Sequence, residues 1–66
     1  MKPEVITIAS DSHLVVAQLE TEIFVAVHFE KNVMGEYDTM ETRFLKSPMQ
    51  VYGFAQELRD REAELF

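Results

Sequence analysis

The sequence predicts an α+β fold: a four-stranded antiparallel sheet (β-β-β-β-α) with one C-terminal helix packed on one face. Three observations predict it. Segments rich in β-branched residues occupy the first two thirds of the chain, polar turn clusters separate these segments, and a helix start signal follows them. With 66 residues, the chain has room for one small α+β domain, which we place at 1–66.

The first two strands are expected on either side of a polar turn. Residues 4–9 contain four β-branched side chains, which favour a strand. Ser10, Asp11 and Ser12 follow, and their short polar side chains compete for backbone hydrogen bonds, as is typical of turns. Residues 13–19 are therefore expected to form the second strand.

The third strand is expected over residues 22–30, after a bend at Glu20 and Thr21. A helix over residues 12–29 is the alternative for this part of the chain. The Val, Ile and Thr residues of that stretch favour a sheet, because branching at Cβ restricts χ1 in a helix.

A connection over residues 31–36 leads to the fourth strand, which we expect over residues 37–45. The connection contains Asn32 and Gly35, two residue types that are typical of turns. We expect Gly35 to adopt a positive φ, since glycine has no Cβ to oppose it.

A helix is expected from Pro48 nearly to the end of the chain. Ser47 is suited to cap the free amides of the first turn, proline fits the first helical position, and Gln50 can complete a capping box. Successive residues turn by about 100°, so apolar side chains share one face. These residues are Val51, Phe54, Ala55, Leu58 and Leu65. Glu62 also points toward that face, which is unusual for a carboxylate.

A tight hairpin centred on Glu20 and Thr21 pairs residues whose numbers sum to 41, and this register predicts the two faces of the sheet. The face under the helix is expected to carry Leu14, Val16, Gln18, Ile23, Val25, Val27, Met40 and Phe44. The opposite face is expected to carry Val15, Ala17, Leu19, Phe24 and Ala26, with Tyr37 nearby. Around them we expect Glu22, Glu30, Glu41, Thr39, Arg43 and both histidines.

An apolar centre with an acidic edge is typical of an interaction surface. The alternative is an ordinary sheet exterior, since apolar atoms make up over half of most protein surfaces. The acidic residues have two interpretations as well. They keep a small protein soluble, or their carboxylates imitate nucleic-acid phosphates in the basic groove of a partner.

Composition excludes several function classes. Twelve acidic and six basic residues give a formal net charge of −6, which repels phosphate backbones and argues against direct nucleic-acid binding. Cysteine is absent, so disulfides and thiol chemistry are excluded. The sequence contains no paired nucleophile and base and no phosphate-binding glycine loop, and we expect no enzyme activity and no cofactor.

His13 and His28 face each other in the register whose numbers sum to 41. With Glu30 or Glu22 they would supply part of a metal site. Solvated imidazoles and a pH-sensitive interface are the alternatives, and we expect no metal. The chain has no apolar run of membrane-spanning length and no signal-peptide segment, so we expect a cytoplasmic protein without membrane association, in a bacterial host if phage-encoded.

Four antiparallel strands followed by a capped helix are similar in order to the transcriptional coactivator family that binds single-stranded DNA as a homodimer. The resemblance covers element order and size and implies a sheet that binds a single strand. Arg43 is the only basic candidate on that sheet. In length and charge the chain also resembles small acidic phage-encoded inhibitors that imitate DNA. No residue motif connects it to either group.

The sequence therefore favours a small acidic, non-enzymatic protein-binding module. It would be an inhibitor or modulator that occupies a basic, nucleic-acid-binding partner protein, in the manner of a DNA mimic. The expected partner-binding residues are Phe24, Tyr37, Glu22, Glu30, Glu41 and Asp38. The alternative is a homodimeric module that binds single-stranded nucleic acid or has a structural role through the same sheet face.

Overall fold

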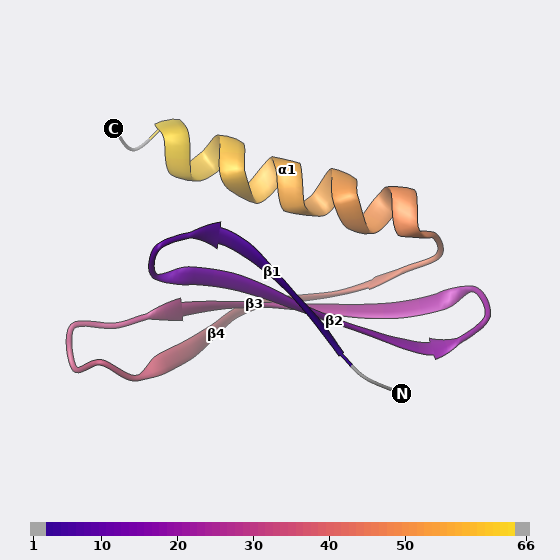
Figure 1. Cartoon of the computed structure of the whole chain (residues 1–66), viewed down its shortest axis with the longest axis horizontal. Helices are drawn as coiled ribbons and strands as arrows, with labels where there is room; N and C mark the ends of the chain where they lie inside the picture. Colours follow the sequence, from indigo (N-terminus) through magenta and orange to yellow (C-terminus); the bar gives the residue numbers. More distant parts are fainter. Residues whose placement is uncertain (1–2, 65–66) are drawn as a thin grey trace.

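Four strands and one helix follow one another in the part of the chain that the computed structural model describes, residues 3–64. The strands form one antiparallel sheet in the order β1-β2-β3-β4, and the helix lies along one side of it (Figure 1). This confirms the predicted fold class. The elements are β1 (Glu4–Ala9), β2 (Ser12–Glu20), β3 (Ile23–Lys31), β4 (Tyr37–Leu45) and α1 (Pro48–Glu64).

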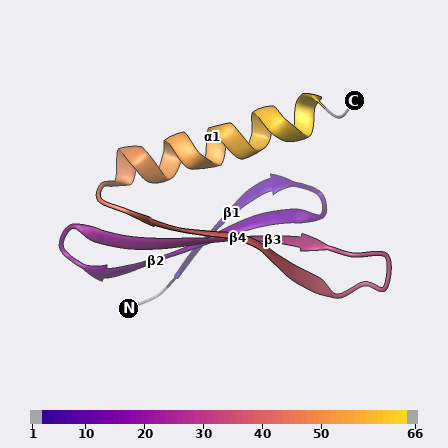
Figure 2. The ribbon, with the colours of Figure 1, turned by 180° about the vertical axis from the view of Figure 1, so that it is seen from behind.

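The β3–β4 loop is held by the side chain of Asn32. Its Oδ1 accepts hydrogen bonds from the backbone amides of Met34 at 2.9 Å and Glu36 at 3.1 Å. Gly35 has φ +85°, as expected, and its amide donates to the carbonyl of Asn32 at 3.0 Å. The β3–β4 loop and the β2–β3 turn lie at opposite ends of the sheet, as the view from behind also shows (Figure 2).

The start of α1 is capped as its sequence indicates. Ser47 Oγ accepts a hydrogen bond from the amide of Gln50 at 3.2 Å. Gln50 Oε1 accepts in turn from the amide of Lys46 at 2.9 Å, one residue before the position of a standard capping box. Two amides of the helix entry are thus satisfied by side chains. Within residues 3–64, no helix is long and apolar enough to cross a membrane.

The core lies between the helix and the sheet. Its buried members are Ile8, Leu14, Val16, Ala26, Val51, Phe54, Ala55 and Leu58, with Ile6, Phe24 and Leu45 packed against them. The expected apolar face of the helix is confirmed for the four members that are described. Leu65, the fifth, lies outside the described residues. Leu14 and Leu58 are almost wholly buried, and each such side chain contributes roughly 1.5–3 kcal/mol of hydrophobic stabilisation.

The predicted register between β2 and β3 is wrong by one residue. Paired residue numbers sum to 42, from Ser12 opposite Glu30 to Gln18 opposite Phe24. The predicted bend at Glu20 and Thr21 is wrong, because the turn consists of Thr21 and Glu22, and Glu20 pairs with Ile23. That turn alone would give pairs whose numbers sum to 43. A β-bulge then lowers the sum by one: the pairing shifts between Gln18 and Glu20, so Leu19 is an extra residue beside the turn. A shift of one residue exchanges the two faces of a strand. In β3, the even-numbered residues therefore face α1.

The expected pairing of β3 with β4 is also wrong. Val25 lies opposite Phe44 and His28 opposite Glu41, and a second bulge at Met40 brings Thr39 opposite Phe29. Because cross-strand partners share a face, Phe44 follows Val25 to the side away from the helix. Phe44 is 70% exposed, whereas the register expected from the sequence puts it beneath α1.

Candidate functional site

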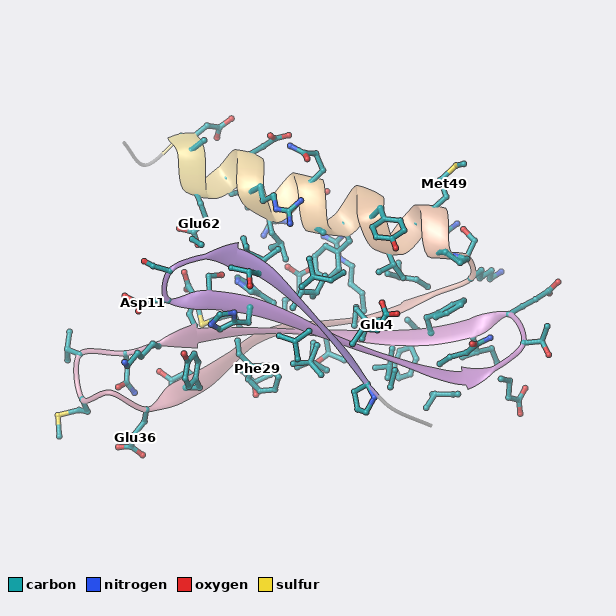
Figure 3. The ribbon with its side chains drawn as sticks, viewed as in Figure 1. Glu4, Asp11, Phe29, Glu36, Met49 and Glu62 are labelled. Carbon is teal, nitrogen blue, oxygen red and sulfur yellow. The ribbon has the colours of Figure 1, made fainter. Side chains whose placement is uncertain are left out.

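One face of the sheet has no helix over it, and we call it the open face. Its members follow from the register, because the alternate residues of β2 and β3 are buried beneath α1. Figure 3 shows Phe29 on this side, away from the helix. The open face consists of Val5, Thr7, His13, Val15, Ala17, Val25, Val27, Phe29, Lys31, Tyr37, Thr39, Thr42 and Phe44.

The open face is apolar to a degree that a solvated sheet exterior is not. Of its thirteen residues, Lys31, the last residue of β3, is the one that carries a formal charge, and no Asp or Glu is among them. Phe44 is 70% exposed, Val5 65% and Tyr37 50%. Phe44 lies opposite the half-buried Val25, and Val5 lies opposite the half-buried Val15. An antiparallel sheet with one solvated face usually alternates apolar with polar side chains. A continuous apolar exterior of this kind favours an interaction surface over an ordinary exterior.

His13 and Tyr37 lie close together on the open face. Their ring centroids lie 5.7 Å apart with the planes tilted by 50°. Among the described residues, His13 Nδ1 is the buried side-chain polar atom without a hydrogen-bond partner. His13 lies opposite Phe29, and His28 lies opposite Leu14 on the other face. The predicted histidine pair is therefore wrong, and the two imidazoles belong to opposite sides of the sheet.

Exposed carboxylates lie at both ends of the open face. Glu20 and Glu22 lie at the β2–β3 turn, near Lys46. At the other end, Asp11 is in the β1–β2 turn, and its carbonyl accepts from the amide of Lys31 at 2.8 Å. The β3–β4 loop adds the exposed carboxylate of Glu36 to that end. The centre of this surface is thus uncharged and its ends are acidic.

Of the six expected binding residues, the structure brings two to the open face or its end. Tyr37 is on the open face, and Glu22 is exposed at one end of it. Asp38 is exposed as well, but it lies opposite Glu30 and is therefore on the helix side of the sheet. The placement of Phe24 on this face is wrong, because the bulge turns it toward the core. There it lines a hollow of about 300 Å³ beside the start of α1.

The placement of Glu30 and Glu41 at the edge of the same face is also wrong. Both are half-buried on the side of the helix. The register prediction did not place Phe44 and Val25 on the open face. To place them correctly, the sequence would have had to indicate the bulge at Leu19, and the residue types there do not indicate one.

A four-member ion-pair network joins β4 to the helix. Arg43 bonds Glu41 at 2.6 Å and Glu57 at 2.8 Å, while Arg61 bonds Glu41 at 3.3 Å and Glu57 at 2.9 Å. The guanidinium of Arg43 also lies 4.2 Å from the ring centroid of Phe54. The hydrogen bond from Arg43 lowers the pKa of Glu41. Two of the basic side chains are therefore already paired on the helix side.

A second polar group lies on the same side of the sheet, toward the end of α1. A ring nitrogen of His28 and one carboxylate oxygen each of Glu30 and Glu62 lie within 4.8 Å of one another. Burial lowers the pKa of His28, so its imidazole is neutral at neutral pH. A hydrogen bond shared with Glu30 raises the pKa of Glu62. These are the described residues whose donor atoms suit a metal ion.

Comparison with known proteins found no matching family model, curated protein or solved structure.

Proposed function

We propose that the chain is a non-enzymatic protein-binding module whose open face binds a partner protein with a basic surface. The observation that carries this proposal is the composition of the open face, whose uncharged, apolar centre has carboxylates at both ends. Protein interfaces have the same arrangement, with a desolvated apolar core and a polar rim. A partner of the kind that binds nucleic acid supplies the complementary positive rim.

Phe44 and Tyr37 are the expected anchors of the interface. Both are large, exposed aromatic side chains on β4, and aromatic residues are enriched among the few positions that carry most of the binding energy. Val25, which lies opposite Phe44, and Val27, two residues further along β3, are half-buried and give a firm apolar floor beside Phe44. Binding thus requires little ordering of flexible side chains, which keeps its entropic cost low.

The net charge favours a different, basic protein over a second copy of the chain. Two copies with a formal charge of −6 each repel one another, and Glu22 and Glu36 would approach carboxylates of the second copy in a face-to-face dimer. A basic partner gains from the same charges, both in the rate of encounter and in specificity. The acidic ends would then occupy sites that the partner otherwise offers to phosphates.

The test compares matched variants in binding to a partner captured from an extract of the organism that encodes the chain. Phe44→Ala is expected to weaken the purified complex about tenfold or more. Tyr52→Ala, which removes an aromatic side chain with 64% exposure from the helix, is its control and leaves the affinity unchanged. The double variant Glu22→Lys/Glu36→Lys is expected to bind the partner more weakly, and its affinity is expected to depend less on salt concentration. Glu64→Lys on the helix is the control and is expected to have neither effect.

Two further outcomes decide between partners. A short DNA duplex added as competitor is expected to displace the chain from the partner, because both occupy the same basic surface. Sedimentation of the isolated chain is expected to show a monomer. A dimer that Phe44→Arg dissociates would contradict the proposal and assign the open face to a second copy.

A further inference from the structure

The side chains of His28, Glu30 and Glu62 meet between the sheet and the last turns of the helix. They line a pocket of about 250 Å³ together with Met40, Glu41, Leu58 and Arg61. Figure 3 shows Glu62 pointing from the helix toward the sheet. This pocket lies on the side of the sheet opposite the open face, so a ligand bound in it is independent of the proposed protein binding.

The donor atoms already lie close together. One nitrogen of His28 and one oxygen of each glutamate are within 4.8 Å of one another. A zinc ion bonded at about 2.0–2.2 Å holds tetrahedral ligand atoms roughly 3.3 Å apart. Small χ rotations of the two half-buried glutamates are sufficient to bring their oxygens from the observed spacing to the spacing that zinc requires.

His28 is fixed in place before any ion arrives. It is 7% exposed, and its Nε2 lies 2.6 Å from Ser12 Oγ, which is itself 2% exposed. When Ser12 accepts this hydrogen bond, Nδ1 carries the free electron pair that a metal ion needs. Metal-binding histidines usually have their second ring nitrogen hydrogen-bonded in this way, which sets the tautomer and the orientation of the ring.

The charges in the pocket favour a cation. Two carboxylates face each other in a half-buried position, where like charges repel strongly. Arg61, the basic residue that lines this pocket, is bonded to Glu41 and Glu57. Among residues 3–64, neither Glu30 nor Glu62 forms an ion pair. One divalent ion would neutralise both carboxylates at once.

We propose that His28, Glu30 and Glu62 bind one divalent transition-metal ion, Zn²⁺ or an ion of similar ligand preference, that joins the end of α1 to β3. One imidazole and two carboxylates form a donor set that suits such ions. Three protein ligands leave at least one coordination position, which water fills through the pocket. The ion acts as a structural clamp between the last turns of the helix and the sheet.

The test titrates Zn²⁺ into chelator-treated protein without an affinity tag. Calorimetry is expected to give one site per chain, and saturation at about 100 times Kd raises Tm by about 10–20 °C. Nitrogen NMR of the imidazoles is expected to show a large shift for His28 and none for His13, which lies on the other face. His13→Gln and Glu64→Gln are the controls and retain full affinity.

Glu62→Gln and Glu30→Gln are the decisive variants, because His28 is buried and its replacement also disturbs the core. Each is expected to lose at least about 90% of the affinity. Each variant is also expected to raise Tm of the metal-free protein, because one of the two repelling charges is gone. A glutamate with a purely structural role would not both lower the Zn²⁺ affinity and raise Tm when replaced. Equal Zn²⁺ binding by these variants and the parent chain, or a Kd weaker than about 1 mM in the parent, would overturn the proposal.

Discussion

Arg43 connects the sheet to the helix through ion pairs and an aromatic contact. Its guanidinium contacts Glu41 from its own strand and Glu57 from the helix, and it covers the ring of Phe54. The stem of such a side chain packs while its head stays hydrated. Isolated surface ion pairs contribute little to the stability of the fold. Here four charges form one network, and one of them lies over the ring of Phe54, so the network positions the helix over the sheet.

The ion-pair network makes one carboxylate sensitive to acid. The pKa of Glu41 is lowered mainly by its hydrogen bond from Arg43, with Arg61 adding to the effect. Arg61 and Glu57 face it from the helix and His28 from β3. A lowered folded-state pKa contributes stability above the unfolded pKa, and this contribution disappears as pH falls through the folded pKa.

We therefore expect Glu41→Gln to be less stable than the parent chain at about pH 7, and the difference to shrink as pH falls through the lowered pKa of Glu41. Thermal unfolding of both proteins across this range provides the measurement. Asp60→Gln, a carboxylate replacement on the exposed side of the helix, is the control. A stability difference that persists unchanged at the acid end would contradict the assigned role of Glu41.

Two phenylalanines distinguish the observed register from the one that the sequence predicts. Phe24 packs against the core, whereas Phe44 is 70% exposed. Phe24→Ala is expected to lower the free energy of unfolding by about 2 kcal/mol, and Phe44→Ala to change it by about 0.5 kcal/mol or less. Urea denaturation measures both. A larger loss of unfolding free energy for Phe44→Ala than for Phe24→Ala would contradict the observed register and support the one whose numbers sum to 41.

At the scale of the elements, the chain shows which features its sequence can and cannot predict. Element order and helix start follow from local chemistry: β-branched segments, turn residues and the Ser47–Pro48 cap. The assignment of residues to faces depends on register, which one bulge at Leu19 reverses for all of β3. The sequence therefore located Tyr37 and Glu22 at the open face or its end and misplaced Phe24, Glu30, Asp38 and Glu41.

The two glycines belong to different elements and are expected to respond in opposite ways to alanine. Gly53 is in the helix interior, and a Cβ there would meet no atom within 4 Å. Gly53→Ala should stabilise the chain by about 0.5–1 kcal/mol, because alanine loses less backbone entropy. Gly35 has φ +85°, so Gly35→Ala should destabilise it by about 1 kcal/mol. Chemical denaturation measures the free energy of unfolding of both variants. A lower value for Gly53→Ala than for the parent chain would contradict the assignment of Gly53 as a tolerated helix glycine.

At the scale of the whole molecule, one helix covers one face of a four-stranded sheet and leaves the other without a layer. A domain of about 60 residues buries only about 60% of the surface that its unfolded chain exposes, so its stability is small. Partner binding on the open face and an ion at the helix end would each add stability by mass action. The two proposed sites lie on opposite sides of the sheet, so substitutions that remove one are expected to leave the other intact.

The most direct test of partner binding at the open face is methyl NMR of the labelled chain during titration with its captured partner. We predict that signals of Val15, Val25 and Val27, on the open face, shift or broaden as the complex forms. Met49, 82% exposed on the helix, should keep its signal unchanged. A titration in which Met49 shifts and the three valines do not would place the partner on the helix and contradict the proposed function of the open face.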